Sequence, residues 1–334
     1  MPKIKAMLKS LKINKHFSQR ICHVWQNSPI DAEYGPVPQD LDPKIVSYLQ
    51  KNSISLYSHQ AEGIKRCLAG ENVIVTTPTA SGKTMIFNLS VLNSMIKNKK
   101  SRAMYIYPRK ALANDQMKSL LVLERDLAIR INPAIYDGDT PQSQKGTIRT
   151  RSRLIMTNPH ELHYCLGNHY KWKKEFWENL EYIIIDEAHM YRGIFGSHIA
   201  LLLRRIKRIC NWYGCNPKLI LSSATIANAV EFAEKLTQED SFCLIDKSGA
   251  PESLKHFVLY NPFMEGLGYY LSPANETLRL FHLFVTKGLQ TLSFIGSRKM
   301  AELIAFFSKG SLNKKNFADL ADKVIVYKAG YTPG

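Results

Sequence analysis

The sequence predicts an α/β fold whose parallel sheet is covered by helices on both faces. Short apolar segments alternate with longer segments of helical period between about residues 50 and 240. Strands of four to six apolar residues that are separated by helices are typical of parallel sheets buried on both faces. The expected strands are ENVIVTTP (71–78), AMYIYP (103–108), RLIMTNP (153–159), EYIIID (181–186) and PKLILSSAT (217–225).

Helices are expected between these strands, at residues 84–96, 110–127 and 196–210. A second α/β segment follows, with helices at 276–288 and 297–310 and strands at QTLSFIG (290–296) and KVIVYKAG (323–330). A complete second domain would need ~150 residues. We therefore expect only the first part of one within this chain.

The composition favours a polyanionic partner. The 334 residues carry a formal charge of +17, and such basic proteins often bind nucleic acid. A merely basic surface is the alternative. No apolar run approaches the ~20 residues of a membrane span, so no membrane association is expected. Of the six cysteines only Cys210 and Cys215 are close in sequence, which argues against a zinc site and predicts reduced thiols.

The segment TTPTASGKT (Thr76–Thr84) ends like a phosphate-binding loop. Gly82, Lys83 and Thr84 fit the end of the G-x-x-x-x-G-K-[ST] pattern, whereas Thr77 stands in place of its first glycine. The loop lies between an expected strand and an expected helix, where backbone N–H groups can hold phosphates. Lys83 would pair with the β- and γ-phosphates, and Thr84 would hold Mg²⁺. A plain surface turn is the alternative.

A pair of acids follows the buried strand of IIIDEAH (Ile183–His189). Asp186 would emerge at the carboxyl edge of the sheet, where open α/β sheets bind ligands, and could hold Mg²⁺. Glu187 is placed to orient and deprotonate a water molecule. Two adjacent acids at such a place are rarely structural, because burying unpaired carboxylates is costly.

The motifs TPTASGKT, DEAH and SSAT, in this order, resemble motifs I, II and III of superfamily-two DEAH-box helicases. That family often replaces the first glycine of the loop with Ala or Thr. LYSHQ (56–60) resembles the Q motif, PRKALANDQ (108–116) motif Ia, YDGDT (136–140) motif Ib, TNPH (157–160) motif Ic and LSFIGSRKMAE (292–302) motif IV. AEYGPVP (32–38) and the residues after DEAH resemble the mitomycin-repair type of DNA helicase, which is related to RecQ-like helicases with a cysteine-rich C-terminal domain.

The resemblance implies a RecA-like P-loop domain that uses ATP and Mg²⁺, followed by the start of a second RecA-like domain. Gln60 would read the adenine edge, and His189, Ser223 and Thr225 would couple the γ-phosphate to the DNA-binding surface. His189 thus joins Lys83 and the acid pair as a catalytic candidate. The nucleotide-binding candidates are Gln60, Thr79, Ala80, Ser81, Gly82, Lys83 and Thr84. Loop polarity is the alternative for the coupling residues, and Thr225 could merely cap the next helix.

By the same resemblance, a further set of residues would grip a sugar–phosphate backbone without reading sequence. These residues are Arg109, Lys110, Gly138, Asp139, Thr157, Asn158 and, in the second domain, Arg298. A solvated surface is the alternative for each. The aromatic and basic segment HYKWKKEFW (169–177) could stack on bases, but packing of its aromatic side chains is favoured.

The expected organisation is a basic N-terminal extension (1–50), a RecA-like ATP-binding domain (51–245), a linker (246–272) and an incomplete RecA-like domain (273–334). Motifs V and VI, with the arginine fingers, are not in the sequence, so we expect a truncated form, a fragment or half of a split enzyme.

The resulting hypothesis is an ATP-dependent 3′ to 5′ DNA helicase that acts in repair. It would be a monomer on single-stranded or forked DNA, in the cytoplasm at the nucleoid, or in the nucleus of a eukaryote. The alternatives are a module that binds ATP and nucleic acid without efficient turnover, and an RNA helicase.

Overall fold

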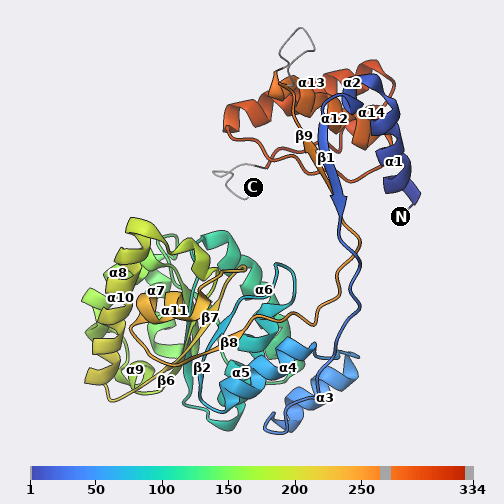
Figure 1. Ribbon diagram of the computed structural model, residues 1–334. Coiled ribbons are helices and arrows are strands. Elements are labelled where there is room, and N and C mark those ends of the chain that lie inside the picture. Colours follow the sequence, from blue (N-terminus) through green and yellow to red (C-terminus); the bar gives the residue numbers. More distant parts are fainter. Residues whose placement is uncertain (1, 264–271, 328–334) are drawn as a thin grey trace. The chain divides into compact units, whose positions relative to one another are not determined.

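Two segments from opposite ends of the chain form one unit, and the residues between them form another. The computed structural model describes residues 2–263 and 272–327 and is drawn in Figure 1. The sheet unit comprises Ile30–Glu252, and the small unit combines Met1–Pro29 with Ser253–Gly334. The basic segment 1–50 is therefore divided between the units. The division arises because the strand near residue 25 pairs with a strand beyond residue 255.

The sheet unit is built on a seven-stranded sheet in which every neighbouring pair is parallel. The strand order is β4-β5-β3-β6-β7-β2-β8. The strands are β2 (Asn72–Val75), β3 (Arg102–Ile106), β4 (Ala134–Ile135), β5 (Leu154–Thr157), β6 (Leu180–Ile185), β7 (Lys218–Ser222) and β8 (Phe242–Ile245). The five strands expected in this region are confirmed. The two edge strands, β4 and β8, are not among the expected strands. With two residues, β4 is too short to leave a periodic pattern in the sequence.

Helices cover both faces of this sheet (Figure 1). One face is packed against α3 (Pro43–Lys51), α4 (Ser58–Leu68), α5 (Lys83–Lys97) and α6 (Lys110–Asp126). The other face is packed against α8 (Pro159–Gly167), α9 (Lys174–Glu178), α10 (Gly193–Trp212) and α11 (Ala229–Thr237). The loops also contain α7 (Gln142–Arg151) and the 3₁₀ turns η1 (His169–Lys171) and η2 (Ala188–Met190). The unit is thus a three-layer α/β/α sandwich.

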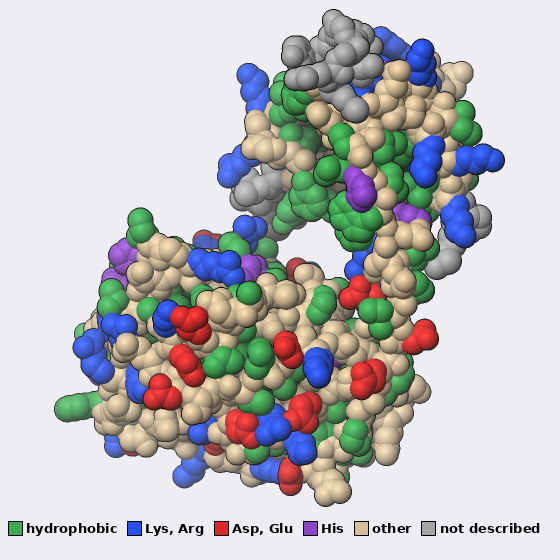
Figure 2. Space-filling view, viewed as in Figure 1, with side chains coloured by type: hydrophobic (Ala, Val, Ile, Leu, Met, Phe, Trp, Pro, Cys, Tyr) green, Lys and Arg blue, Asp and Glu red, His purple; other side chains and the backbone are tan. Residues whose placement is uncertain are grey.

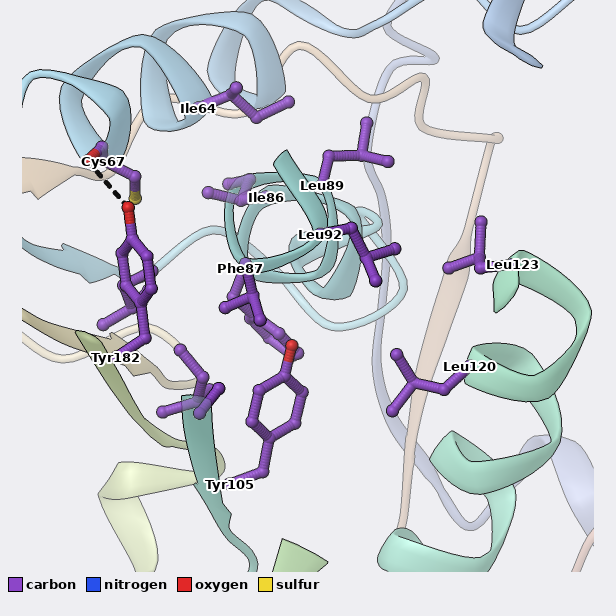
Figure 3. Close-up of a cluster of buried hydrophobic side chains, with 14 of the residues drawn as sticks. Ile64, Cys67, Ile86, Phe87, Leu89, Leu92, Tyr105, Leu120, Leu123 and Tyr182 are labelled. Carbon is purple, nitrogen blue, oxygen red and sulfur yellow. Dashed lines mark hydrogen bonds between the residues drawn. The ribbon is translucent and has the colours of Figure 1, made fainter. Parts of the chain in front are cut away.

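Side chains alternate along each strand between two cores. In β2, Val73 and Val75 enter the first core and Ile74 enters the second. Figure 3 shows the first core, where Tyr105 and Tyr182 lie among aliphatic side chains of α4, α5 and α6. The hydroxyl of Tyr105 donates to Asn88 at 3.0 Å. Both faces are apolar along the central strands, so polar side chains gather where the strands end.

The interleaved aromatic and basic segment packs in the second core. Trp172, Phe176 and Trp177 are buried there, which confirms the packing interpretation. None of the helices in the described part of the chain is long and apolar enough to cross a membrane.

The small unit joins the two ends of the chain. In it, β1 (Ile21–Gln26) pairs antiparallel with β9 (His256–Tyr260). Its helices are α1 (Pro2–Ile13), α2 (Lys15–Ser18), α12 (Pro273–Thr286), α13 (Arg298–Lys314) and α14 (Ala318–Ala321). The buried carboxylate of Glu276 accepts hydrogen bonds from His16 (2.9 Å) and Tyr260. This contact fixes the N-terminal segment to the later part of the chain.

Two strands expected in the small unit are wrong within the described residues. Residues 290–296 and 323–327 form no strand, and residues 328–330 lie outside the described part. A strand needs a neighbouring strand for its backbone N–H and C=O groups, and here β1 and β9 pair with each other. The expected linker 246–272 also contains β9, while residues 264–271 lie outside the described part.

Candidate nucleotide site and nucleic-acid edge

The phosphate-binding loop connects β2 to α5, as the sequence predicts. Residues 76–82 leave the carboxyl end of β2 and turn through two left-handed positions, Ala80 (φ 64°) and Gly82 (φ 81°). Helix α5 then begins at Lys83. The N–H groups at the start of this helix, together with the helix dipole, form an electropositive end suited to phosphate.

The structure has room for the side chain of Thr77, which stands where the motif has its first glycine. It is fully buried, its φ is not positive, and its hydroxyl lies 2.7 Å from the hydroxyl of Ser81. Because the backbone at Thr77 does not need glycine, a hydroxyl side chain can close the loop instead.

Gln60 joins α4 to the loop. Its Oε1 accepts from the N–H of Tyr57 at 3.0 Å, and its Nε2 donates to the carbonyl of Gly82 at 3.0 Å. A Cβ added at Gly82 would lie 2.5 Å from that Nε2. Glycine is therefore favoured at position 82 by its φ, and any other side chain there would also displace the Gln60 amide. The adenine contact predicted for Gln60 stays a prediction, and one N–H of its amide group remains available for it.

Lys83 faces the acid pair. Its ammonium group donates to the carbonyls of Thr77 (2.7 Å) and Pro78 (3.0 Å). Burial lowers the pKa of Lys83, and the negative charges of Glu187 and Asp186 partly oppose this shift. An incoming phosphate can replace the two carbonyl acceptors with a full charge, which favours phosphate binding.

Asp186 lies directly after β6 and is 8% exposed. Burial raises the pKa of its carboxyl group, while hydrogen bonds from the Ser222 hydroxyl and the Glu187 N–H lower it. A buried carboxylate without a full partner charge is a good ligand for a divalent cation. The predicted Mg²⁺ ligands, Asp186 after β6 and the Thr84 hydroxyl at the start of α5, are oxygen donors of the kind that Mg²⁺ takes, and their role in holding it stays a prediction.

Glu187 has a strained backbone. Its φ is 51°, a left-handed conformation that is uncommon for a non-glycine residue and that occurs often at functional sites. The hydrogen bond from its N–H to Asp186 Oδ1 (2.9 Å) holds this turn. Its side chain is one-third exposed. Glu187 is therefore accessible to water beside the buried Asp186.

His189 connects the acid pair to the segment after β7. Its Nδ1 lies 3.2 Å from the N–H of Ala224 and 3.2 Å from Glu187 Oε2. One ring nitrogen cannot accept from Ala224 and donate to Glu187 at once. The neutral ring with an unprotonated Nδ1 accepts from Ala224, whereas the protonated ring would pair with Glu187. His189 therefore contacts both the acid-pair segment and the SSAT segment after β7.

The other two coupling candidates, Ser223 and Thr225, differ in burial. Ser223 is fully buried; its N–H donates to Val75 of β2 at 2.9 Å and its hydroxyl to the Ala224 carbonyl at 2.8 Å. Thr225 is exposed. The capping alternative for Thr225 is wrong, because Asn228 is the N-cap residue of α11.

Three of the nucleic-acid candidates lie together. Lys110 begins α6, and its ammonium group lies 2.6 Å from Asp139 Oδ2, while a Cβ at Gly138 would lie 3.8 Å from it. The hydrogen bond to Asp139 raises the pKa of Lys110. Arg109, the N-cap residue of α6, is exposed. Lys110, Gly138 and Asp139 thus form one exposed cluster beside Arg109.

The remaining candidates are placed differently. Thr157 ends β5 and is 4% exposed, and Asn158 Oδ1 caps α8 by accepting from the N–H of Glu161 at 3.0 Å. Asn158 therefore has a local structural role besides the predicted one. Arg298 begins α13 in the small unit and is exposed. Contacts of all these residues with nucleic acid stay predictions.

The topology of the sheet gathers these residues at one edge. All strands are parallel, so their carboxyl ends meet at the same edge of the sheet. Apart from Gln60, which lies in α4, the nucleotide and coupling candidates follow β6, β7 and β2, which are adjacent in the strand order. The nucleic-acid candidates of this unit follow β4, β5 and β3, which are also adjacent. The edge thus has two neighbouring halves, and β3 beside β6 forms their boundary.

Sequence reasoning missed several residues that shape this edge. Ser222 bonds Asp186, although only the second serine of SSAT was singled out. Asp137 is buried, and its Oδ1 accepts from the N–H groups of Asp139 (2.9 Å) and Thr140 (3.1 Å). An Asp two residues before such a turn signals an Asx-type turn and could have been recognised.

Comparisons with known proteins agree with this geometry. Residues 57–232, just over half of the chain, match the family model described as DEAD/DEAH box helicase. The uncharacterised ATP-dependent helicase YprA of Bacillus subtilis is 40% identical over 310 residues, which cover 91% of this chain and 41% of YprA. The ATP-dependent helicase HRQ1 of Saccharomyces cerevisiae is 31% identical over 336 residues, which cover 98% of this chain and 31% of HRQ1.

Among solved structures, the DUF1998 helicase MrfA bound to DNA and AMPPNP superposes with a TM-score of 0.86 at 37% identity. The match covers 98% of this chain and 45% of that one. The chain thus spans less than half the length of these relatives. The RecA-like fold expected from the sequence is confirmed. The family match and the shared arrangement of the sheet lead to one conclusion: the chain belongs to the DEAD/DEAH box helicase family of superfamily two.

Proposed function

We propose that this chain is the part of an ATP-dependent DNA helicase that binds and hydrolyses ATP and contacts single-stranded DNA. The observation that carries the proposal is the sheet edge with its two neighbouring halves. One half holds a phosphate loop facing two acids, and the other holds exposed basic side chains. Related proteins whose names describe ATP-dependent helicases support it.

In this proposal Lys83 and the N–H groups at the start of α5 bind the phosphates of ATP. Glu187 accepts a proton from the attacking water. His189 accepts the N–H of Ala224 and lies beside Glu187, so it links the acid pair to the segment after β7. Mg²⁺, held by Asp186 and Thr84, would neutralise charge on the phosphates. Gln60 keeps Gly82 in place and reads adenine with its remaining N–H.

The charge distribution supports a nucleic-acid partner. Residues 1–29 and 253–334 contain 16 Lys and Arg against 5 Asp and Glu, so one-third of the chain carries most of the net charge of +17. The face of the sheet unit in Figure 2 shows acidic and basic side chains interspersed. We propose single-stranded or forked DNA as the partner, because the related MrfA was solved with DNA.

The finer features of the proposal are 3′ to 5′ movement, a role in DNA repair, action as a monomer, and a site of action at the nucleoid or in a nucleus. They rest on the motif resemblance.

The test is the ATPase rate of the 334-residue chain with and without single-stranded DNA, beside a Glu187→Gln variant. The proposal expects a rate that DNA increases and that the variant loses. ATP and DNA binding without turnover would favour the binding-module alternative, because transition-state charge would then lack an arginine worth roughly 10³–10⁵ in rate in other P-loop enzymes. Equal stimulation by RNA would favour an RNA helicase, and absence of ATP binding would refute the proposal.

A further inference from the structure

A buried histidine that is not among the predicted nucleotide-binding residues joins two distant segments of the sheet unit. His59, in α4, is 3% exposed. Its Nε2 lies 3.0 Å from the carbonyl oxygen of Ser81 in the phosphate loop. Its Nδ1 lies 3.1 Å from the backbone nitrogen of Gly249. Both ring nitrogens are therefore used, and each contacts the backbone of a different segment.

These partners define the tautomer of the ring. The N–H of Gly249 can only donate, so Nδ1 carries no proton, and the proton on Nε2 is donated to the Ser81 carbonyl. Burial lowers the pKa of His59, the hydrogen bond to the Ser81 carbonyl partly opposes this shift, and the positive charge of Lys83 adds to it. The ring is thus held neutral as a one-proton bridge between two backbone groups.

Gly249 belongs to the connector, residues 246–252, through which the chain leaves β8 toward the small unit. The Gly249 carbonyl accepts from the N–H of Glu33 at 2.9 Å, and the Glu33 carbonyl accepts from the N–H of Ser58 at 2.8 Å. Ile30 and Glu252 pair through two backbone hydrogen bonds of 2.9 Å. Backbone hydrogen bonds therefore join the two segments that connect the units, near residues 30–33 and 249–252, beside the start of α4.

The contact at Gly249 leaves no room for a side chain. A Cβ there would lie 2.5 Å from the Glu33 carbonyl and 2.9 Å from the Ser58 backbone nitrogen. The glycine thus allows the connector to approach α4 closely enough for its N–H to reach His59.

The other end of the bridge is the Ser81 carbonyl, in the loop where the phosphate is proposed to bind. Ser81 lies between the left-handed positions Ala80 and Gly82. The loop is also closed by the ammonium group of Lys83, which donates to the carbonyls of Thr77 and Pro78. A phosphate that takes this ammonium group and the N–H groups of α5 removes those two closing bonds. Within the described part of the chain, Ser81 is then held only by its hydroxyl contact with Thr77, its N–H bond to the Pro78 carbonyl and the bond from His59, so its backbone can turn more easily.

We propose that His59 is a positioning residue that couples the phosphate loop to the connector, so that nucleotide in the loop changes how firmly the connector is held. The inference deepens the proposed function and rests on it. A turn of the Ser81 carbonyl takes away the acceptor of Nε2, the ring shifts, and the Gly249 N–H loses or changes its bond. Nucleotide in the loop thereby changes the hydrogen bonding of the connector, which leads to the small unit.

The test is hydrogen–deuterium exchange of peptides that cover residues 246–252, with and without AMPPNP and Mg²⁺, in the full chain. Nucleotide affinity is measured in parallel with a fluorescent ATP analogue. In the unchanged protein, AMPPNP is expected to alter exchange in the connector. His59→Phe keeps a ring of similar size but loses both hydrogen bonds, so the nucleotide-dependent change should disappear while nucleotide still binds.

Two further variants separate the halves of the bridge. The Oδ1 of His59→Asn can stand near the place of Nδ1 and accept from Gly249, but its side chain is too short to reach Ser81. This variant should protect the connector without a response to nucleotide. Gly249→Ala, whose Cβ would push the connector away from Glu33 and from Ser58 of α4, should also lose the response. Lys65→Ala, at an exposed position of the same helix, is the control and should respond normally.

The outcomes are distinct. Nucleotide binding with unchanged exchange at 246–252 in the unmodified protein overturns the inference and leaves the proposed function intact. A normal response in folded His59→Phe or His59→Asn overturns it as well. Failure of the unmodified protein to bind the ATP analogue would overturn the proposed function, and the inference with it.

Discussion

Substitution of Gly82 by alanine tests the geometry of the phosphate loop. The residue has φ 81°, a conformation that costs an L-residue roughly 1–2 kcal/mol. The added Cβ would lie 2.5 Å from Gln60 Nε2, so the amide must move and its hydrogen bond to the Gly82 carbonyl is lost. A hydrogen bond of this kind contributes about 1 kcal/mol. The native loop is therefore disfavoured by about 2–3 kcal/mol in total.

A penalty of this size on the loop that binds phosphate corresponds to about a 30- to 150-fold weaker affinity, since 1.4 kcal/mol is tenfold. The assay is calorimetric titration of the variant with AMPPNP and Mg²⁺, with circular dichroism to confirm folding. Gly146→Ala is the matched control, because Gly146 lies exposed in α7 with no atom near its Cβ position. Alanine there should leave affinity unchanged and stabilise the helix slightly. Affinity of Gly82→Ala within threefold of the unmodified protein would refute the reasoning.

Three other substitutions probe stability, pH dependence and nucleic-acid binding. The Arg153 guanidinium donates to four backbone carbonyls at 2.8–3.3 Å, so Arg153→Lys should lower the free energy of unfolding by about 2 kcal/mol in chemical denaturation. Burial raises the pKa of Asp186, so its ionised form opposes folding above that pKa and the penalty fades as pH falls. Asp186→Asn should therefore raise Tm at neutral pH, by an amount that shrinks in acid, and abolish Mg²⁺-dependent nucleotide binding. Lys110→Gln should weaken binding to single-stranded DNA and reduce the slope of log K against log salt by about 0.7.

Each of these substitutions has its own control. Arg151→Lys, at an exposed position two residues earlier, should leave stability unchanged. For Asp186→Asn, a Tm difference that is constant from neutral to acid pH would show that another group causes the shift. For Lys110, the control is Lys118→Gln on the same helix, where the side chain is 82% exposed. An equal loss of affinity in both lysine variants would mean that α6 contributes only general charge.

The central sheet could be predicted from the sequence because its strands are buried on both faces. A continuous apolar run such as YIIID (182–186) can be buried on both faces only inside the sheet, so the residue after it must emerge at the sheet edge. Asp186 and Lys83 were therefore placed correctly beside each other from separate motifs. Their assigned roles in binding and catalysis remain predictions.

The features that escaped prediction depend on contacts between distant segments. The pairing of β1 with β9 joins residues more than 200 positions apart, and no local pattern in the sequence predicts it. The bridge from His59 to Ser81 and Gly249 could not be predicted either, because a histidine within LYSHQ has no spacing that points to these partners. The expected strands at 290–296 and 323–330 show the opposite error. Their apolar composition favours a strand, but strand formation also needs a partner.

The central claim is that one sheet edge binds nucleotide and nucleic acid in neighbouring halves whose states are linked. The most direct measurement is the affinity of the chain for a fluorescein-labelled single-stranded oligonucleotide, with and without saturating AMPPNP and Mg²⁺. Linked sites should change oligonucleotide affinity by about fivefold or more, and the oligonucleotide should change AMPPNP affinity by the same factor. Binding of both ligands with affinities that do not depend on each other would contradict the account.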